Sequence, residues 1–416
     1  MTKAILICYD LPNNLWKKLN GFAMKTAEGG GEMEPLCTAE ALVQILKQLH
    51  RWPETAYEEY QTAQLIRSVL READIPLIDT GMDTCTVALI RGGRPGKTIA
   101  LRADIDALPM QEETDLPWKS QREGVMHACG HDFHTAMMLG AAILLKERQA
   151  DLPGCVKIIF QPAEELDNGA DQVIASGVVD DCELFLAGHS YPQFKAGTIG
   201  VKEGAVMAAV DRFAVTIRGT GCHAGQPNKG VDPIVIAAHT IINLEELKAR
   251  EIPAPEPTSL TMGYIKGGEA VNIIPDTVEL GGTLRAHDPA NRRFVLQRVK
   301  EVAEGTAAMF RGSCRVAFSD GAKVVQNDPA LTAVVTAAAE KVVGRDFICS
   351  NFEPCMGSED FSEYQAIKPG VFWFLCSGSE DPRTQIPHHN PKFDIDESVL
   401  WKGSAVFVSL ASDYLK

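Results

Sequence analysis

The densest group of chemically capable side chains lies in the segment His127-Ala128-Cys129-Gly130-His131-Asp132-Phe133-His134. A single glycine separates Cys129 from His131, so the backbone can turn tightly enough to aim both side chains at one point. A thiolate and an imidazole placed in this way are typical ligands of a transition-metal ion. The competing interpretation is a loop ahead of a helix, in which Asp132 caps the helix and the histidines are merely polar.

Two adjacent carboxylates, Glu164 and Glu165, follow the apolar run Val156 to Phe160. Like charges close to a core repel each other and lose hydration, so the pair needs a nearby cation or must keep a proton. One carboxylate acting as a metal ligand and its neighbour acting as a general base would meet that need. An exposed pair of glutamates in a loop is the alternative.

Two further histidines follow buried or loop segments, His189 after the run Leu184 to Ala187 and His389 in the sequence HHNP. Taken singly, each is more typical of a satisfied core histidine than of a ligand. Taken together, the candidate ligands suit zinc, manganese or cobalt better than magnesium or calcium. They exceed the number that one catalytic zinc ion takes, so we expect two divalent metal ions with a bridging hydroxide. The candidate ligands are Cys129, His131, Glu165, His189 and His389.

The elements that must position these residues are strands alternating with helices. Two helical faces between Ala39 and Arg71 flank a break at Trp52-Pro53, and Thr135 to Lys146 also reads as a helix. Short apolar runs end in polar residues of the candidate site or in a glycine- and serine-rich loop. This pattern predicts an α/β fold with a central mixed sheet, whose strand ends carry the site. The runs are Thr98 to Leu101, Val156 to Phe160, Leu184 to Ala187 and Val371 to Cys376.

The region from 211 to 317 has a different pattern of strands and helices. Its order, β-α-β-β-α-β, is that of a ferredoxin-like α+β domain. We therefore expect an inserted lid and dimerisation domain at 211–317 within a discontinuous metal-binding domain made of 36–210 and 318–416. Residues 1–35 are expected to form an N-terminal extension.

Composition excludes several partners. The chain has 416 residues and a net charge of −15, from 55 acidic and 40 basic residues, which argues against binding to nucleic acid or to an anionic membrane. It contains no apolar run of about 18 residues and no evident signal peptide. The 11 cysteines form no spaced framework, which indicates reduced thiols and a cytoplasmic location. An anionic substrate would require a specifically placed cation.

Several ordered motifs closely resemble the M20 metallopeptidase family, in its aminoacylase, hippurate hydrolase and auxin-conjugate hydrolase branch, over residues 37–416. The resemblance implies an amidohydrolase that cleaves N-acyl amino acids with two metal ions per subunit, zinc or manganese first, cobalt or nickel next. The ligand set above matches the metal-binding positions, Glu164 matches the general base, and Asp106 matches an aspartate that orients the site. The motifs are LRADIDALPM, HACGHDFHTA, FQPAEE, GHSYP, GTGCHAGQP, NIIPD, GTLRA and HHNPKFDIDE.

The resemblance also implies a homodimer or homotetramer in which His223 reaches the neighbouring subunit's site. Asn272 and Arg285 match substrate-holding positions, and Arg285 could grip a carboxylate in a bidentate manner. Some positions depart from the wider family. Asp104 stands where other branches have a histidine ligand, and Cys129 where they have a bridging aspartate. Cys222, Asn228 and Ser358 are atypical near the substrate positions. His127 and His134 are expected only to support the ligands, and His50 has no assigned role.

Three alternatives remain open at this point. The substrate could be p-aminobenzoyl-glutamate or a small dipeptide. The protein could instead be a non-catalytic structural zinc protein, although a spare carboxylate at Glu164 has no use in a closed site. It could also be a ligand-binding protein that retains Arg285 and Asn272 without turnover.

Overall fold

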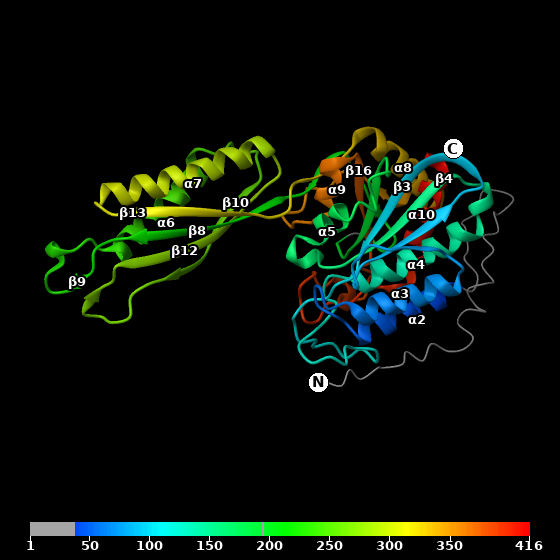
Figure 1. The fold of residues 1–416 in the computed structure, drawn as a ribbon, viewed down its shortest axis with the longest axis horizontal. Helices are drawn as coiled ribbons and strands as arrows, with labels where there is room; N and C mark the ends of the chain where they lie inside the picture. The colour runs from blue at the N-terminus through cyan, green and yellow to red at the C-terminus, as the bar shows by residue number, and fades with distance from the viewer. Residues whose placement is uncertain (1–37, 194) are drawn as a thin grey trace. The chain divides into compact units, whose positions relative to one another are not determined.

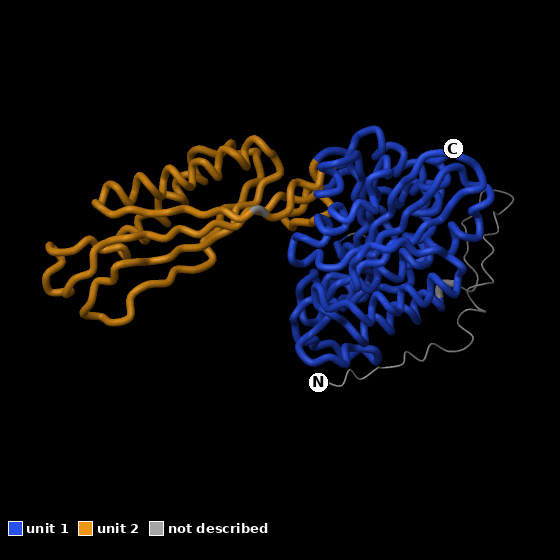
Figure 2. Tube along the Cα trace, viewed as in Figure 1, with its two compact units in different colours: residues 1–204, 327–352, 363–416 blue, residues 205–326, 353–362 orange. Residues whose placement is uncertain are grey.

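The computed structural model describes residues 38–193 and 195–416, which form two compact units. Unit 1 contains the chain up to Gly204, Asn327–Phe352 and Glu363–Lys416, and unit 2 contains Ala205–Gln326 and Glu353–Ser362 (Figure 2). Unit 2 thus includes the short segment 353–362, which the expected insertion at 211–317 did not contain. The expected extension at 1–35 lies outside the described residues.

Unit 1 is built on an eight-stranded mixed sheet (Figure 1). The strands β4, β3, β5 and β16 are neighbours and run parallel to one another. The runs predicted as strands from their unbroken apolar character lie in these four, because a parallel strand is covered on both faces. In sheet order the strands are β1 (Leu77–Ile78), β2 (Thr86–Arg91), β4 (Pro153–Gln161), β3 (Arg94–Asp104), β5 (Phe185–Tyr191), β16 (Gly370–Cys376), β6 (Ile199–Gly200) and β15 (Ile348–Cys349).

The parallel strands end at one edge of this sheet. Asp104 at the end of β3 pairs with Gln161 at the end of β4, and His189 of β5 pairs with Phe374 of β16. The polar residues that follow each strand are thereby gathered at the carboxyl edge, as predicted.

Helices pack on this sheet and on one another. The predicted helical faces around Trp52-Pro53 form α2 and α3, and their apolar residues are buried. The helices of unit 1 are α2 (Thr38–Arg51), α3 (Tyr60–Glu72), α4 (His131–Glu147), α5 (Gly169–Ala175), α8 (Pro329–Val343) and α10 (Leu400–Tyr414), and α9 (Phe361–Ile367) spans the boundary between the units.

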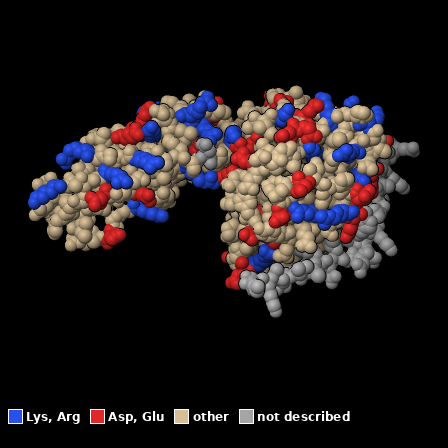
Figure 3. Space-filling model, in the orientation of Figure 1, with Lys and Arg blue, Asp and Glu red and all other residues tan. Residues whose placement is uncertain are grey.

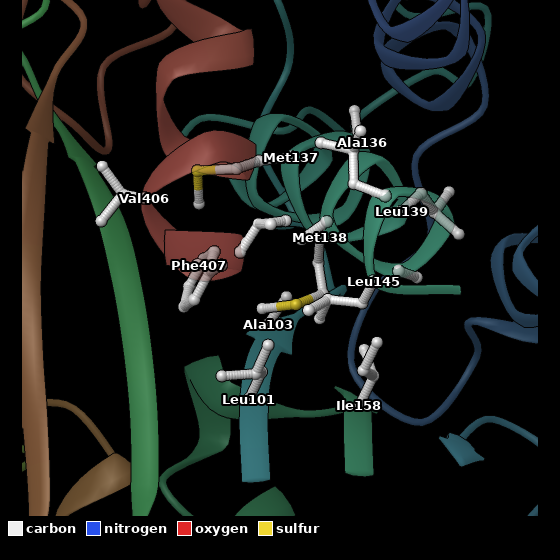
Figure 4. Packing of buried hydrophobic residues seen from close by; sticks show 14 of the residues in the cluster. Leu101, Ala103, Ala136, Met137, Met138, Leu139, Leu145, Ile158, Val406 and Phe407 are labelled. Atoms are coloured by element: carbon white, nitrogen blue, oxygen red, sulfur yellow. The ribbon is translucent and has the colours of Figure 1, made fainter. Parts of the chain in front are cut away.

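Helix α4 is buried along nearly its whole length, since it lies between the sheet and other helices. Figure 4 shows Met137 and Met138 of α4 next to Phe407 of α10, with Leu101 and Ala103 of β3 below them. A helix held on every side is a rigid support, and its first residue is His131. The candidate ligand is therefore attached to an element that is buried along nearly its whole length.

Unit 2 has the predicted ferredoxin-like order, with an antiparallel sheet β10-β12-β8-β13 and two helices (Figure 1). Both helices begin with Asp-Pro, and the side chains of Asp232 and Asp288 cap them by accepting backbone N–H bonds. The elements are β8 (Ala209–Arg218), α6 (Pro233–Arg250), β10 (Thr258–Lys266), β12 (Thr277–Ala286), α7 (Pro289–Met309) and β13 (Ser313–Asp320). Two short ribbons are formed by β9 (Cys222–His223) paired to β11 (Ile273–Ile274), and by β7 (Gly204–Met207) paired to β14 (Val325–Asn327).

Among the described residues, no helix combines the length and the apolar character that a membrane crossing requires. Basic and acidic side chains are interspersed on the face seen in Figure 3. The predicted fold class, an α/β domain with a central mixed sheet and an inserted ferredoxin-like α+β domain, is confirmed.

Candidate metal centre

The backbone between Cys129 and His131 adopts the tight turn that the sequence predicted. Gly130 has φ +84° and is the N-cap of α4. A Cβ atom at this position would lie 2.5 Å from the Ser190 hydroxyl oxygen, so only glycine fits both the conformation and the space. The two flanking side chains consequently leave the turn toward the carboxyl edge of the sheet.

The candidate ligands converge there, and all of them belong to unit 1. One ligand atom from each of Cys129, Glu165 and His389 lies within 4.8 Å of the others. Cys129 Sγ is also 3.6 Å from His189 Nε2, and His131 Nε2 is 3.9 Å from Glu165 Oε1. The Cys129 thiol therefore lies near both His189 and His389, where it could be a ligand shared by two metal ions.

The imidazole rings are oriented by bonds on their far sides. His131 Nδ1 is 3.2 Å from Asp106 Oδ1, and His189 Nδ1 donates to the Ser190 carbonyl at 2.7 Å. Each ring thus keeps Nε2 for the centre, which is how metal-binding histidines are normally held. The loop of His389, whose φ is +60°, is tied to the Ala128 carbonyl by its backbone N–H at 2.8 Å.

Unpartnered buried atoms test whether a cation fits. Within the part of the chain that the structure describes, His131 Nε2 and Glu165 Oε1 are buried and have no hydrogen-bond partner. Glu165 Oε1 is 3.4 Å from His389 Nε2, but without hydrogen-bond geometry. Such atoms cost free energy unless something binds them. A thiol, imidazoles and a carboxylate around one point form a donor set that suits a divalent transition-metal ion.

The electrostatics of the site also favour a cation. The neighbouring Cys129 and Glu165 side chains raise the pKa of His389 to about 10. Burial lowers the pKa of His131, but Asp104, Cys129 and Asp106 outweigh it and hold that pKa well above its usual value. Burial raises the pKa of the Cys129 thiol, so its thiolate needs a positive partner. A bound metal ion would supply that positive charge and deprotonate the thiol.

A second cluster, formed by Asp104, His131, His134 and His189, lies within the same 4.8 Å limit. Asp104 accepts from Arg102 Nη1 at 2.7 Å and from His134 Nδ1 at 2.6 Å, while His134 Nε2 accepts the Ser190 N–H at 2.8 Å. Both carboxylate oxygens of Asp104 and both nitrogens of His134 are therefore engaged. Both residues are therefore placed to support the candidate ligands, as expected for His134.

Asp106 holds the turn that carries the two glutamates. Its Oδ1 and Oδ2 atoms accept the backbone N–H groups of Glu164 and Glu165 at 3.1 and 3.0 Å. The same carboxylate contacts His131, so it fixes both sides of the centre at once. Glu164 is 7% exposed, and its carboxylate lies within reach of His131 and Glu165.

The expected substrate residues belong to unit 2. His223 is exposed on the ribbon β9 and pairs with Ile273, next to Asn272. The Gly225 N–H donates to His223 Nδ1 at 2.9 Å, which leaves the ring proton on Nε2. Arg285 lies apart from them on β12, where Nη1 donates to the Met356 carbonyl at 2.9 Å. The structure thus brings His223 and Asn272 together within unit 2, but not Arg285.

Two supporting residues were given no role from the sequence. His50, to which no role was assigned, bonds Asp132 Oδ2 at 2.7 Å and lies 3.3 Å from Glu112 Oε1. Arg102 is 1% exposed and holds Asp104. The partners of His50 are remote in sequence, so residue type and spacing gave no indication of its role, whereas Arg102 lies two positions before Asp104 in the motif LRADIDALPM.

Comparison with known proteins agrees with this geometry. The chain matches the model of peptidase family M20/M25/M40 over residues 100–413. It is 42% identical over 364 residues to an N-acetyl-L-cysteine deacetylase of Bacillus subtilis, covering 87% of this chain and 85% of the relative. It is 35% identical over 382 residues to an IAA-amino acid hydrolase of Arabidopsis thaliana, covering 90% and 86%.

A solved structure from Bacillus subtilis, described as a dinuclear metal binding peptidase from the M20 family, superimposes with a TM-score of 0.80 at 36% identity. The match covers 91% of this chain and 98% of that one. Sequence motifs, fold and relatives therefore agree, and this chain belongs to the M20/M25/M40 peptidase family of metal-dependent hydrolases.

Proposed function

We propose that this protein hydrolyses the amide bond of N-acyl amino acids at a centre of two divalent metal ions. The observation that carries the proposal is the convergence of Cys129, His131, Glu165, His189 and His389 beside Glu164. Relatives named as an N-acetylcysteine deacetylase and an IAA-amino acid hydrolase support this substrate class. Zinc or manganese suits the donor set best, with cobalt or nickel next.

When bound, the metal ions would activate water and polarise the amide carbonyl. Glu164, held by Asp106 at the edge of the centre, takes the proton from the attacking water and passes it to the departing amine. His223 carries its proton on Nε2 and from there donates a hydrogen bond that stabilises the developing oxyanion. Arg285 and Asn272 hold the amino acid portion, and the guanidinium pairs with its carboxylate.

The protein acts as a homodimer or homotetramer in this proposal, and the partner subunit's His223 completes each centre. Exposed apolar side chains in unit 2 support association, since they cluster on or beside the ribbon and on α6. Val271 is fully exposed, Ile273 is 58% exposed and Ile242 is 63% exposed. A cytoplasmic location is supported by the cysteines, because those in the described residues are free thiols.

An assay of N-acetyl, N-benzoyl and indole-acetyl amino acids, with the released amine measured and each metal added in turn, tests the proposal. We expect turnover of at least one class that is abolished by chelation and restored by metal. The panel includes p-aminobenzoyl-glutamate and dipeptides. Turnover of p-aminobenzoyl-glutamate or dipeptides alone would show that the substrates are not the N-acyl amino acids proposed. Metal that resists chelation with no turnover would favour a structural zinc protein.

A further inference from the structure

Glu59 occupies the N-cap position directly before helix α3, but its side chain does not cap the helix. A residue at this position normally accepts a hydrogen bond from its own helix, yet the Glu59 side chain makes none there. Glu54 does so instead, since its Oε2 accepts the Thr62 N–H at 2.8 Å and the Thr62 hydroxyl at 3.0 Å. The Glu59 carboxyl is therefore available for another partner, although the residue is completely buried.

That partner is the backbone of the turn ahead of the catalytic glutamates. Glu59 Oε1 accepts the Ala163 N–H at 2.9 Å, across a separation of 104 residues. Ala163 has φ +55°, a left-handed conformation that is unfavourable for a non-glycine residue. It is also wholly buried, so water cannot satisfy its N–H group. The conformation persists because the surrounding structure holds it.

The Glu59 bond completes a series of three. The consecutive N–H groups of Ala163, Glu164 and Glu165 are accepted by Glu59 Oε1, Asp106 Oδ1 and Asp106 Oδ2. Two buried carboxylates from different parts of the chain thus define the path of the backbone that carries both glutamates. Loss of either would free the turn to relax from its left-handed start.

We propose that Glu59 is a positioning residue that sets the Glu164-Glu165 pair through the Ala163 N–H group. The role assigned to Glu164 rests on the proposed function, whereas the effect on Glu165 as a ligand is measurable without catalysis. Burial and then Asp106 raise the pKa of Glu59 to about 8, which favours the uncharged acid near neutral pH. The carbonyl oxygen of that acid can accept the Ala163 N–H bond. Glutamine has the same shape and an acceptor oxygen, so it should replace the neutral acid.

The test compares Glu59→Gln, Glu59→Leu and Glu54→Leu in the full-length protein. Glu54 is the matched control, because it is a buried carboxylate at the same helix end that does not touch the turn. For Glu59→Leu we expect kcat and zinc affinity each to fall by about 10- to 100-fold, with KM nearly unchanged, as is typical when a support of a metal ligand is lost. Glu59→Gln should keep both within about threefold, and Glu54→Leu should lower stability without either loss.

Zinc affinity is measured by competition with a chromophoric chelator, separately from turnover. The proposal is overturned if Glu59→Leu keeps wild-type kcat and zinc affinity, or if Glu54→Leu loses them to the same extent. Glu59→Asp, one methylene shorter, replaces Glu59→Leu if the latter does not fold, and the same losses are expected. A wild-type protein without turnover would reject the proposed function, while the zinc affinities would still decide the role of Glu59.

Discussion

Glu164 and Glu165 are adjacent in sequence, and the proposed mechanism gives them different tasks. Glu165 Oε1 lies 3.4 Å from His389 Nε2 and 3.9 Å from His131 Nε2, within the ligand cluster. In Glu164→Gln, we expect metal content to stay at the wild-type value and kcat to fall by about 10²- to 10⁴-fold, since only proton transfer is lost. Metal analysis and steady-state kinetics on one preparation measure both, and unchanged kcat would show that Glu164 is not the base.

Glu165→Gln is the matched comparison for this prediction. It replaces a ligand oxygen, so metal content should fall together with activity. Equal metal content in both variants would contradict the division of tasks between the two glutamates.

At this scale the sequence predicted the residues that converge at the site better than the residues that support them. Cys129, Gly130 and His131 are recognisable because they lie within one turn, where residue type and spacing alone indicate a pair of ligands. The bond from Glu59 to Ala163 joins positions 104 residues apart and uses a backbone N–H, which has no sequence signature. Asp106 was expected to orient the site from the family resemblance, and its bonds to the turn agree with that expectation.

At the scale of elements, His50 links α2 to the start of α4. Its ring lies 2.7 Å from Asp132 Oδ2 and 3.3 Å from Glu112 Oε1. Burial lowers the pKa of His50, but the two carboxylates outweigh it and raise that pKa from 6.5 to about 10. Because the folded pKa exceeds the unfolded one, the ion pairs stabilise the fold fully below about pH 6.5, and that stabilisation is lost as pH rises toward 10.

His50→Gln should therefore destabilise unit 1 by a few kcal/mol, on the order expected for breaking a buried pair. The difference from wild type should be largest near pH 6 and should shrink by pH 10. Urea unfolding of both proteins across this range measures it. A difference that does not change with pH would show that His50 is uncharged in the folded protein.

The elements themselves were largely predictable where local pattern decides them. The buried parallel strands and the break at Trp52-Pro53 follow from apolar runs and periodicity. Short strands such as β6 and β15 have only two residues each, so they exist through pairing and not through propensity. The assignment of 353–362 to unit 2 depends on long-range contacts, including the Arg285 bond to the Met356 carbonyl.

At the scale of the whole molecule, the proposed dimer predicts that two inactive variants can restore each other's activity. His223→Ala and Glu164→Gln should each be inactive alone. If the partner subunit's His223 completes each centre, unfolding and refolding the two variants together should restore about a quarter of wild-type activity, because half of the dimers are mixed and each has one intact centre. Sedimentation velocity confirms the assembly. No restored activity in a verified mixed dimer would place His223 at its own subunit's centre.

The most direct test of the central claim is anomalous diffraction from crystals grown with manganese or zinc. We predict two anomalous peaks per chain, both bordered by Cys129, with His131 and His189 on one side and Glu165 and His389 on the other. Glu164 should coordinate neither ion. A single peak, peaks elsewhere in the chain, or no peak at metal concentrations that support activity would contradict the account.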